Sequence, residues 1–224
     1  MARLTSPAIA MRAQPHDLIW LRDPAAFLAA GAVPEWADAP WLAQAPLVVR
    51  RDRDASGRGR IPVGIRGRTR AQRYATWIDA DQCATVVTPV DIARAGFWRL
   101  HPRRDEIPAL RALDPIARQL GGLPHAWGVT GAVGFTLAAG IDVLHAGSDI
   151  DLLLLALQPL SSAETAILRD VIDHGAARID MQIGTPYGAF ALREFLRTQG
   201  HVLLKTDTGP LLCDDPWNIA CQHC

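Results

Sequence analysis

One stretch constrains the fold more than any other: residues 147–157 read GSDIDLLLLAL, so two carboxylates enter an apolar run of strand length. Residues two apart in a strand share one face and lie roughly 6–7 Å apart, which places Asp149 and Asp151 side by side where the strand begins. Two like charges at a buried position are unfavourable unless a cation lies between them. The pattern therefore predicts a hard divalent cation such as Mg²⁺, which prefers carboxylate oxygen.

A motif as short as Asp-x-Asp also describes two acids that simply cap a strand in solvent, and the neighbouring segments argue against this alternative. Upstream, residues 127–135 are rich in glycine and precede a helix-compatible segment. Downstream, residues 178–183 alternate as a strand does and carry Asp180 at their centre. A glycine turn, a strand with two acids and a strand with a third acid resemble the nucleotidyltransferase superfamily of DNA polymerase β. In that superfamily the first two acids hold two metals and the third completes the site.

Composition excludes several classes of protein. The 224 residues include 23 basic and 23 acidic side chains, and a formal net charge of zero is not that of a general nucleic-acid binder. No apolar run reaches the ~18 residues of a membrane span, and the N-terminus lacks the compact apolar region of a signal peptide. We therefore expect a soluble, cytoplasmic protein that binds neither nucleic acid nor membrane.

The order of the expected elements predicts an α+β fold in two domains. Strands at 45–50 and 61–67 flank a hairpin loop at 52–60, and strands near 77–78 and 84–87 follow. Residues 88–120 are helical with a break near residue 101, a capping box at Ser161–Glu164 begins a helix to about residue 174, and 189–198 is a further helix. We expect a small N-terminal α/β domain over 1–85 with a basic hairpin. A polymerase-β-like catalytic domain with a mixed sheet flanked by helices is expected over 86–224.

Basic charge is concentrated between residues 50 and 73, where nine arginines face two acids, a balance of 9 − 2 = +7. The arginines of the hairpin loop are expected to be solvated. Arg66, Arg70 and Arg73 differ because they follow a strand, and Arg70 and Arg73 share a face if a helix begins there. Arginine grips phosphate oxygens with two parallel hydrogen bonds, so this trio is a candidate phosphate site.

The four cysteines are Cys83, Cys213, Cys221 and Cys224, and the last two flank Gln222-His223. Such a cluster can hold zinc only when its ligands are ordered. Because it ends the chain, where fraying is common, a loose tail with reduced thiols is the favoured interpretation.

Several stretches, in order along residues 15–217, resemble the malonate decarboxylase holo-acyl-carrier-protein synthases, which are phosphoribosyl-dephospho-CoA transferases. The stretches are PHDLIWL at 15–21, VGIRG at 63–67 with Arg70 and Arg73, WG at 127–128 with Gly131 and VGF at 133–135, SDIDL at 148–152, Asp180, and LLKT at 203–206 to DPW at 215–217. One departure is Gly131-Ala132, where the superfamily usually has Gly-Ser or Gly-Gly. Alanine lacks the hydroxyl that would bind a phosphate oxygen, but the backbone N–H groups of the turn still can.

The resemblance implies a reaction and a set of roles. The donor is 2′-(5″-triphosphoribosyl)-3′-dephospho-CoA, the acceptor is a serine of the apo acyl-carrier subunit of malonate decarboxylase, and pyrophosphate is released. Asp149, Asp151 and Asp180 would hold two Mg²⁺ ions, or Mn²⁺, and Asp180 would also take the serine proton. Substrate would be bound by a further set of residues, namely Gly131, Ser148, Arg66, Arg70, Arg73 and Lys205.

Two other functions fit parts of the pattern. The same metal site could serve an enzyme that attaches AMP or UMP to a small molecule or a protein. The acids could instead hold one structural Ca²⁺ in a binding module, although Ca²⁺ sites usually draw 6–8 oxygens from a flexible loop rather than a strand.

Overall fold

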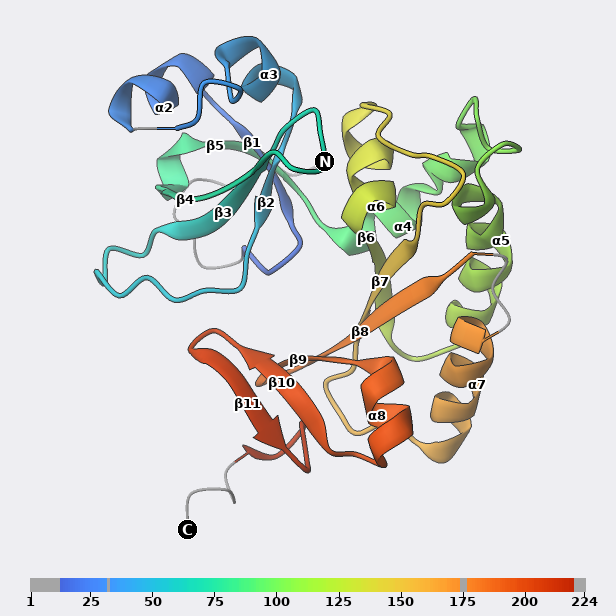
Figure 1. Ribbon diagram of the computed structural model, residues 1–224. Coiled ribbons are helices and arrows are strands. Elements are labelled where there is room, and N and C mark those ends of the chain that lie inside the picture. Colours follow the sequence, from blue (N-terminus) through green and yellow to red (C-terminus); the bar gives the residue numbers. More distant parts are fainter. Residues whose placement is uncertain (1–12, 32, 174–176, 220–224) are drawn as a thin grey trace. The chain divides into compact units, whose positions relative to one another are not determined.

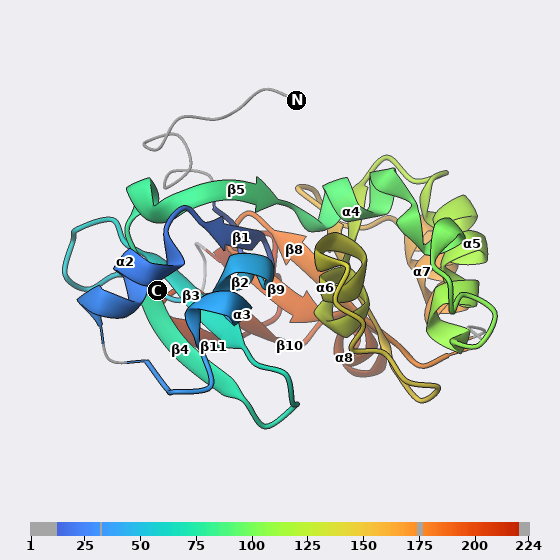
Figure 2. The same ribbon diagram turned by 90° about the horizontal axis from the view of Figure 1, so that it is seen from above.

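The computed structural model describes residues 13–31, 33–173 and 177–219, and the chain divides into two compact units, Met1–Thr88 and Pro89–Cys224. Each unit has its own sheet and its own helices (Figures 1 and 2). The predicted α+β class is confirmed, with a small N-terminal sheet and a mixed C-terminal sheet flanked by helices. The boundary predicted from the sequence lies between residues 85 and 86, and the division of the structure lies between Thr88 and Pro89.

The N-terminal unit is an antiparallel five-stranded sheet in the order β4-β3-β2-β1-β5, and its helices α2 and α3 lie on one side of the sheet (Figure 1). Asp23 and Asp38 cap the two helices by accepting hydrogen bonds from Ala26 N and Trp41 N. The elements are β1 (Leu18–Leu21), α2 (Pro24–Ala30), α3 (Ala39–Gln44), β2 (Leu47–Val49), β3 (Ile61–Arg66), β4 (Arg73–Ile78), a 3-10 turn (Ala80–Gln82) and β5 (Cys83–Val87).

The predicted hairpin around the loop at 52–60 is confirmed, because β2 pairs with β3 on either side of it. The helix considered near Arg70 is wrong. Residues 69–71 form a turn, and Arg73 already begins β4. The run from Arg73 to Ile78 contains aromatic and β-branched side chains that favour a strand, and it pairs along its whole length with β3.

The C-terminal unit is built on a six-stranded mixed sheet in the order β11-β10-β9-β8-β7-β6. β7 and β8 run parallel and are joined through α7, and every other neighbouring pair is antiparallel. The elements are α4 (Pro89–Ala95), a 3-10 turn (Phe97–Leu100), α5 (Pro108–Leu120), β6 (Ala126–Thr130), α6 (Gly131–Ala139), β7 (Ile150–Leu155), α7 (Ser162–Asp173), β8 (Ile179–Thr185), β9 (Gly188–Ala191), α8 (Leu192–Thr198), β10 (Val202–Thr206) and β11 (Gly209–Cys213).

The capping box predicted for α7 is present. Ser161 N donates to the Glu164 carboxylate at 2.7 Å, and Glu164 N donates back to Ser161 Oγ at 3.2 Å. Hydrogen bonds from the Ser161 hydroxyl, and secondly from its backbone N–H, lower the pKa of the Glu164 carboxyl below its usual range.

The helix predicted for 189–198 is wrong in its first part, because residues 188–191 form strand β9 and α8 begins only at Leu192. Pro186 and Tyr187 form a two-residue connection between Thr185 and Gly188, which turns the chain back on β8 as a hairpin. Gly188 also lets β10 approach, since a Cβ there would lie 2.5 Å from Lys205 O.

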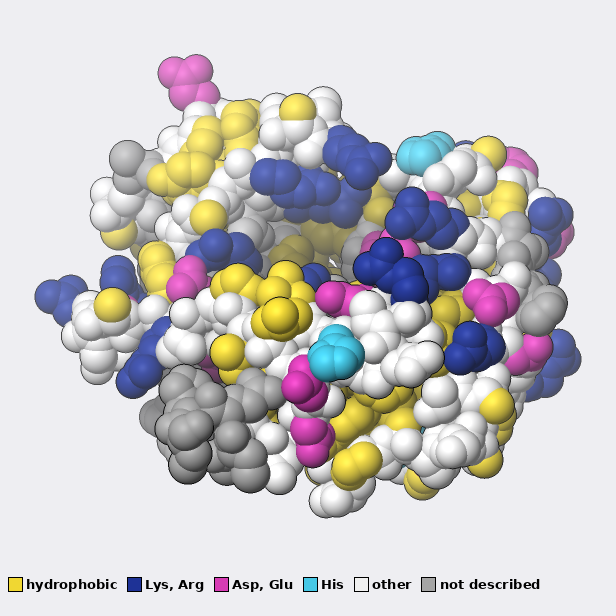
Figure 3. Space-filling view, turned by 60° about the horizontal axis from the view of Figure 1, so that its bottom comes forward, with side chains coloured by type: hydrophobic (Ala, Val, Ile, Leu, Met, Phe, Trp, Pro, Cys, Tyr) yellow, Lys and Arg dark blue, Asp and Glu magenta, His cyan; other side chains and the backbone are white. Residues whose placement is uncertain are grey.

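The surface bears both signs of charge. Figure 3 shows Lys or Arg, Asp or Glu and apolar side chains on the same face. Within the described part of the chain, no helix combines the length and the apolar composition needed to cross a bilayer.

Candidate active site

Two carboxylates from adjacent strands lie side by side in the C-terminal sheet. The parallel register pairs Asp151 on β7 with Asp180 on β8, so both side chains project from the same face of the sheet. Both are half-buried, whereas Ile179 and Met181 on the opposite face are buried, as the alternation of the sequence predicted. They border a cavity of about 260 Å³ whose lining is Thr130, Asp151, Leu152, Asp180, Met181, Gln182, Ala191, Arg193 and Lys205.

Two carboxylates that lie side by side repel each other, so a cation near them is favourable. Arg178 supplies one cation, with its Nη2 at 3.3 Å from Asp180 Oδ2, but the two side chains are 67% and 41% exposed. Exposed ion pairs contribute only about 0–1 kcal/mol. Asp180 can therefore exchange this partner for a metal ion at little energetic cost.

Gly131 is required where it stands. Its φ is +62°, in the left-handed region, and a Cβ there would lie 2.6 Å from the carboxyl carbon of Asp151 and closer still to Oδ2. Gly131 is also the first residue of α6, whose first backbone N–H groups lack partners within the helix. The Asp151 carboxylate thus lies against a helix N-terminus, which favours negative charge.

We expect Gly131→Ala to lower transfer activity at least ~10²-fold, because the new methyl group displaces a carboxylate and a ~1 Å misplacement alone has that effect. Gly140→Ala is the matched control. Gly140 ends the same helix at φ +68° with nothing within 4 Å of its missing Cβ, so both variants carry the same left-handed strain of about 1–2 kcal/mol. Equal losses of kcat/KM in two variants with equal thermal midpoints would contradict this role of Gly131.

The other predicted residues of the Asp149 turn lie outside the cavity lining. Ser148 is buried, and its hydroxyl accepts a hydrogen bond from His145 N at 3.0 Å, which closes the turn before β7. Asp149 is exposed and directly precedes the strand. Across residues 13–31, 33–173 and 177–219, no three His, Cys, Asp or Glu side chains are already grouped as metal ligands.

Lys205, which was predicted to bind substrate, borders the cavity, and three further polar side chains there were missed. Gln182 lies two residues after Asp180 in an alternating strand, so the sequence did hold a signal for it. Thr130 directly precedes Gly131 and pairs with Asp151 in the sheet. Arg193 had no local signal, because α8 is brought to this point only by the turn at Pro186–Tyr187.

Arg193 braces the strand that carries Asp180. Its Nη2 donates to Ile172 O at 2.7 Å and to Ile179 O at 3.4 Å, which ties the end of α7 to the start of β8. An ion pair also joins its Nη1 to Asp173 Oδ1 at 3.5 Å. The position of Asp180 therefore depends on this guanidinium.

The predicted arginine trio lies in the N-terminal unit, in and around one turn. Arg66 and Arg73 are directly opposite in the β3–β4 pair, and Arg70 lies in the turn that joins the strands. Burial, and secondly the charge of Arg70, lower the pKa of the Arg73 guanidinium. Like charges opposite one another in a sheet are unfavourable, so the hairpin is suited to an anion.

The two remaining predictions concern cysteine. Cys83 and Cys213 are buried free thiols, and burial raises the pKa of Cys83 to about 11. Cys221 and Cys224, on which the zinc alternative depends, lie outside the described residues.

Comparisons with known proteins agree on one family over both units. Residues 14–89 match the model of the phosphoribosyl-dephospho-CoA transferase MdcG N-terminal domain, and residues 98–216 match that of its C-terminal domain. A phosphoribosyl-dephospho-CoA transferase of Pseudomonas putida (strain GB-1) is 43% identical over 206 residues, which cover 91% of this chain and 95% of the relative.

Other relatives carry the same description. One from Klebsiella pneumoniae subsp. pneumoniae is 42% identical over 92% of this chain and 96% of its own length, and one from Pseudomonas fluorescens is 38% identical over 91% and 93%. No solved structure matches. On the strength of the matches to both halves, the chain belongs to the phosphoribosyl-dephospho-CoA transferase family and is a transferase.

Proposed function

We propose that this transferase moves the 2′-(5″-phosphoribosyl)-3′-dephospho-CoA unit from its triphosphate donor to a serine of the acyl-carrier subunit of malonate decarboxylase. The observation that carries the proposal is the pair Asp151 and Asp180, in register beside a cavity that also receives Lys205. The family match over both units supplies the class of donor.

The reaction forms one bond and breaks one. The serine hydroxyl oxygen bonds to the α-phosphorus of the triphosphate, the bond from that phosphorus to the bridging oxygen breaks, and pyrophosphate leaves. The serine proton passes to Asp180, which is half-exposed at the cavity and follows Ile179, whose carbonyl accepts a hydrogen bond from Arg193. Lys205 and the backbone N–H groups at the start of α6 offset the negative charge that develops on the departing group.

The oxygen-rich lining fits a hard divalent cation. Mg²⁺ commonly binds through one or two carboxylates plus substrate phosphates, so a pair of acids suffices before the donor arrives. We propose that Asp151 and Asp180 hold Mg²⁺, or Mn²⁺, that Asp149 completes the set, and that two ions are bound. Bound there, the metal would stabilise charge on both the attacking and the leaving oxygen.

The arginine trio is proposed to bind phosphate groups of the donor. If Arg66, Arg70 and Arg73 bind in the bidentate manner, replacing each by Lys should raise the KM for the donor several-fold, because lysine lacks the planar fork. The loop residues Arg53 and Arg58 are exposed and serve as controls for general charge. Equal changes in KM in the two groups would mean that the basic stretch acts only through its overall field.

The proposal is tested by incubating the protein with the purified apo-carrier, Mg²⁺ and donor. The carrier should gain the mass of phosphoribosyl-dephospho-CoA, with one pyrophosphate released per carrier. Incubation with ATP or UTP in place of the donor is the comparison. Mass gain from AMP or UMP, with none from the dephospho-CoA donor, would reject this function in favour of a different nucleotidyl transfer.

A further inference from the structure

Among the described residues of the N-terminal unit, α2 and α3 lie on one side of the sheet, and the other face has an unusual composition. Ile61, Val63 and Ile65 point away from this face and are at most 2% exposed. The residues between them and their partners on β4 point outward, because side chains alternate along a strand. With Arg50 of the preceding segment, these outward residues form what we call the β3–β4 outer face, made up of Arg50, Pro62, Gly64, Arg66, Arg73, Ala75 and Trp77.

The register orders this face into a basic end and an aromatic end. Arg66 and Arg73 are paired at one end, Gly64 and Ala75 in the middle, and Pro62 and Trp77 at the other. Steps of two residues place Arg73, Ala75 and Trp77 at intervals of ~6.6 Å along one strand. Only small residues therefore separate the indole ring from the paired guanidinium groups.

The basic end has charge available for an anion. Arg70 lies in the adjoining turn, and among the described residues no carboxylate forms an ion pair with Arg70 or Arg73. Arg50 lies across the middle of the face, with its Cδ 3.6 Å from the position of a Cβ on Gly64. Its Nη2 pairs with Asp52 at 2.9 Å, and its Nε is buried without an acceptor.

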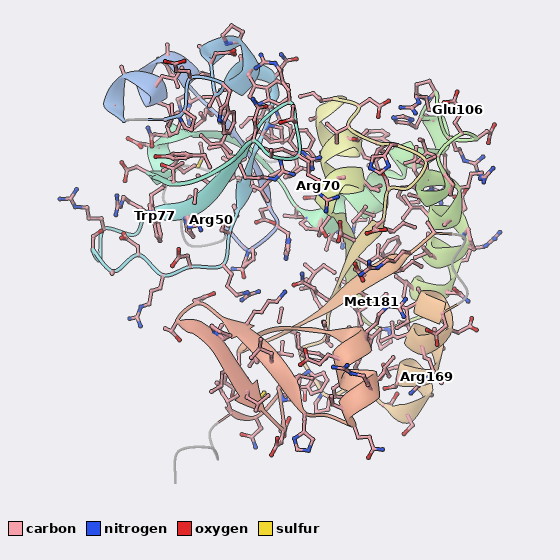
Figure 4. All side chains as sticks on the ribbon, viewed as in Figure 1. Arg50, Arg70, Trp77, Glu106, Arg169 and Met181 are labelled. Carbon is pink, nitrogen blue, oxygen red and sulfur yellow. The ribbon has the colours of Figure 1, made fainter. Side chains whose placement is uncertain are left out.

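The aromatic end offers flat surfaces. Trp77 is half-buried, and the guanidinium carbon of Arg60 lies 5.5 Å from the centroid of its ring. In Figure 4 the labelled Trp77 and Arg50 lie close together along this sheet. Nucleobases stack on aromatic rings and on arginine planes alike. A site for a nucleoside diphosphate needs an aromatic ring for the base and hydrogen-bond donors for the phosphate oxygens, and this face has one at each end.

We propose that the β3–β4 outer face binds the adenosine diphosphate part of the dephospho-CoA donor. Adenine stacks at Trp77, the ribose lies over Ala75, and the diphosphate is held by Arg66 and Arg73 with Arg50. This inference rests on the proposed function for the identity of the donor. It narrows the role of the arginines, because it assigns them the phosphates joined to adenosine rather than the remote triphosphate.

The test is calorimetric titration of the full-length protein with 3′-dephospho-CoA, ADP, pantetheine and inorganic tripolyphosphate, without acceptor or metal. We expect dephospho-CoA and ADP to bind and pantetheine not to bind. Loss of one stacking partner, in Trp77→Ala, should weaken ADP binding about 5- to 100-fold, and Trp77→Phe should restore most of it. Arg73→Gln should weaken ADP binding comparably, whereas Arg58→Gln in the exposed loop should not.

A further variant guards against misfolding at Trp77. Ala75 is exposed on an edge strand, so Ala75→Glu should fold, and its carboxylate should abolish ADP binding. Unchanged ADP affinity in Ala75→Glu, or in a folded Trp77→Ala, overturns the proposal. Tripolyphosphate binding that Arg73→Gln abolishes, with no binding of ADP, would assign the face to the triphosphate and overturn it as well.

These outcomes are separable from those of the proposed function. A protein that binds ADP on this face but adds nothing to the carrier keeps this inference and rejects the transfer. A protein that modifies the carrier, with ADP affinity unaffected by Ala75→Glu and Arg73→Gln, keeps the transfer and rejects this inference alone.

Discussion

Asp151→Asn is expected to leave the fold intact and to lower the rate of transfer by about 10²–10³-fold, which corresponds to ~3–4 kcal/mol of transition-state stabilisation. Asparagine has the same shape, so it fits against Gly131 as the carboxylate does. The substitution removes the negative charge of the Asp151 carboxylate, which together with Asp180 would attract a cation. Because Asp149 lies two residues earlier, at the start of the same strand, we expect a loss of the same order for Asp149→Asn.

The measurement is the initial rate of pyrophosphate release with saturating donor and carrier, together with the thermal midpoint. Asp105→Asn is the control, because this side chain is 89% exposed and its ion pair is with Arg104. A folded Asp151→Asn protein with near-normal turnover would falsify the assignment of Asp151 to a metal site.

Asp180→Asn tests two roles that one carboxylate can combine. If Asp180 only holds metal, excess Mg²⁺ or Mn²⁺ should restore the rate of the variant. If it also accepts the serine proton, added metal cannot replace a base, and a deficit of about 10²–10⁴-fold should persist. We expect the persistent deficit, because Asp180 pairs with Asp151 at the cavity and its ion pair with Arg178 is largely exposed.

The decisive experiment is a metal titration of the Asp180→Asn variant at saturating donor and carrier. Full recovery of the rate at high metal would reject the base assignment. Arg178→Gln is the companion variant, since it removes the exposed partner of Asp180 and leaves the carboxylate in place. Its rate should stay within a few-fold of the unmodified protein, as expected for a surface pair.

The features of the fold that were predicted correctly depend on residues that lie close together in the sequence. The capping box at Ser161–Glu164 satisfies backbone N–H groups within four residues of one another. The alternation of apolar and polar residues around Asp180 corresponds to the buried and the open face of one strand. The strand of Asp151 followed from its apolar run, and the hairpin at 52–60 from its turn residues between two strands.

The parts that were missed depend on pairing between distant segments. Arg70 and Arg73 have helical spacing, but Tyr74 to Ile78 gain more by pairing with β3, and this register, not the spacing, brings Arg66 and Arg73 together. Likewise, Ala189–Ala191 forms a strand because β8 and β10 flank it. Arg193 reaches the cavity only as a result of that arrangement.

The parallel register of β7 and β8 also has a consequence for the order in which the protein folds. Asp151 and Asp180 meet across 180 − 151 = 29 residues of chain that include the whole of α7, whereas β10 and β11 are joined by only two residues. Hairpins close within about 1–10 μs, and contacts between distant segments form more slowly because a longer loop must first be ordered. We therefore expect the full-length chain, when it refolds from denaturant, to complete its C-terminal hairpin before it brings its two acids together.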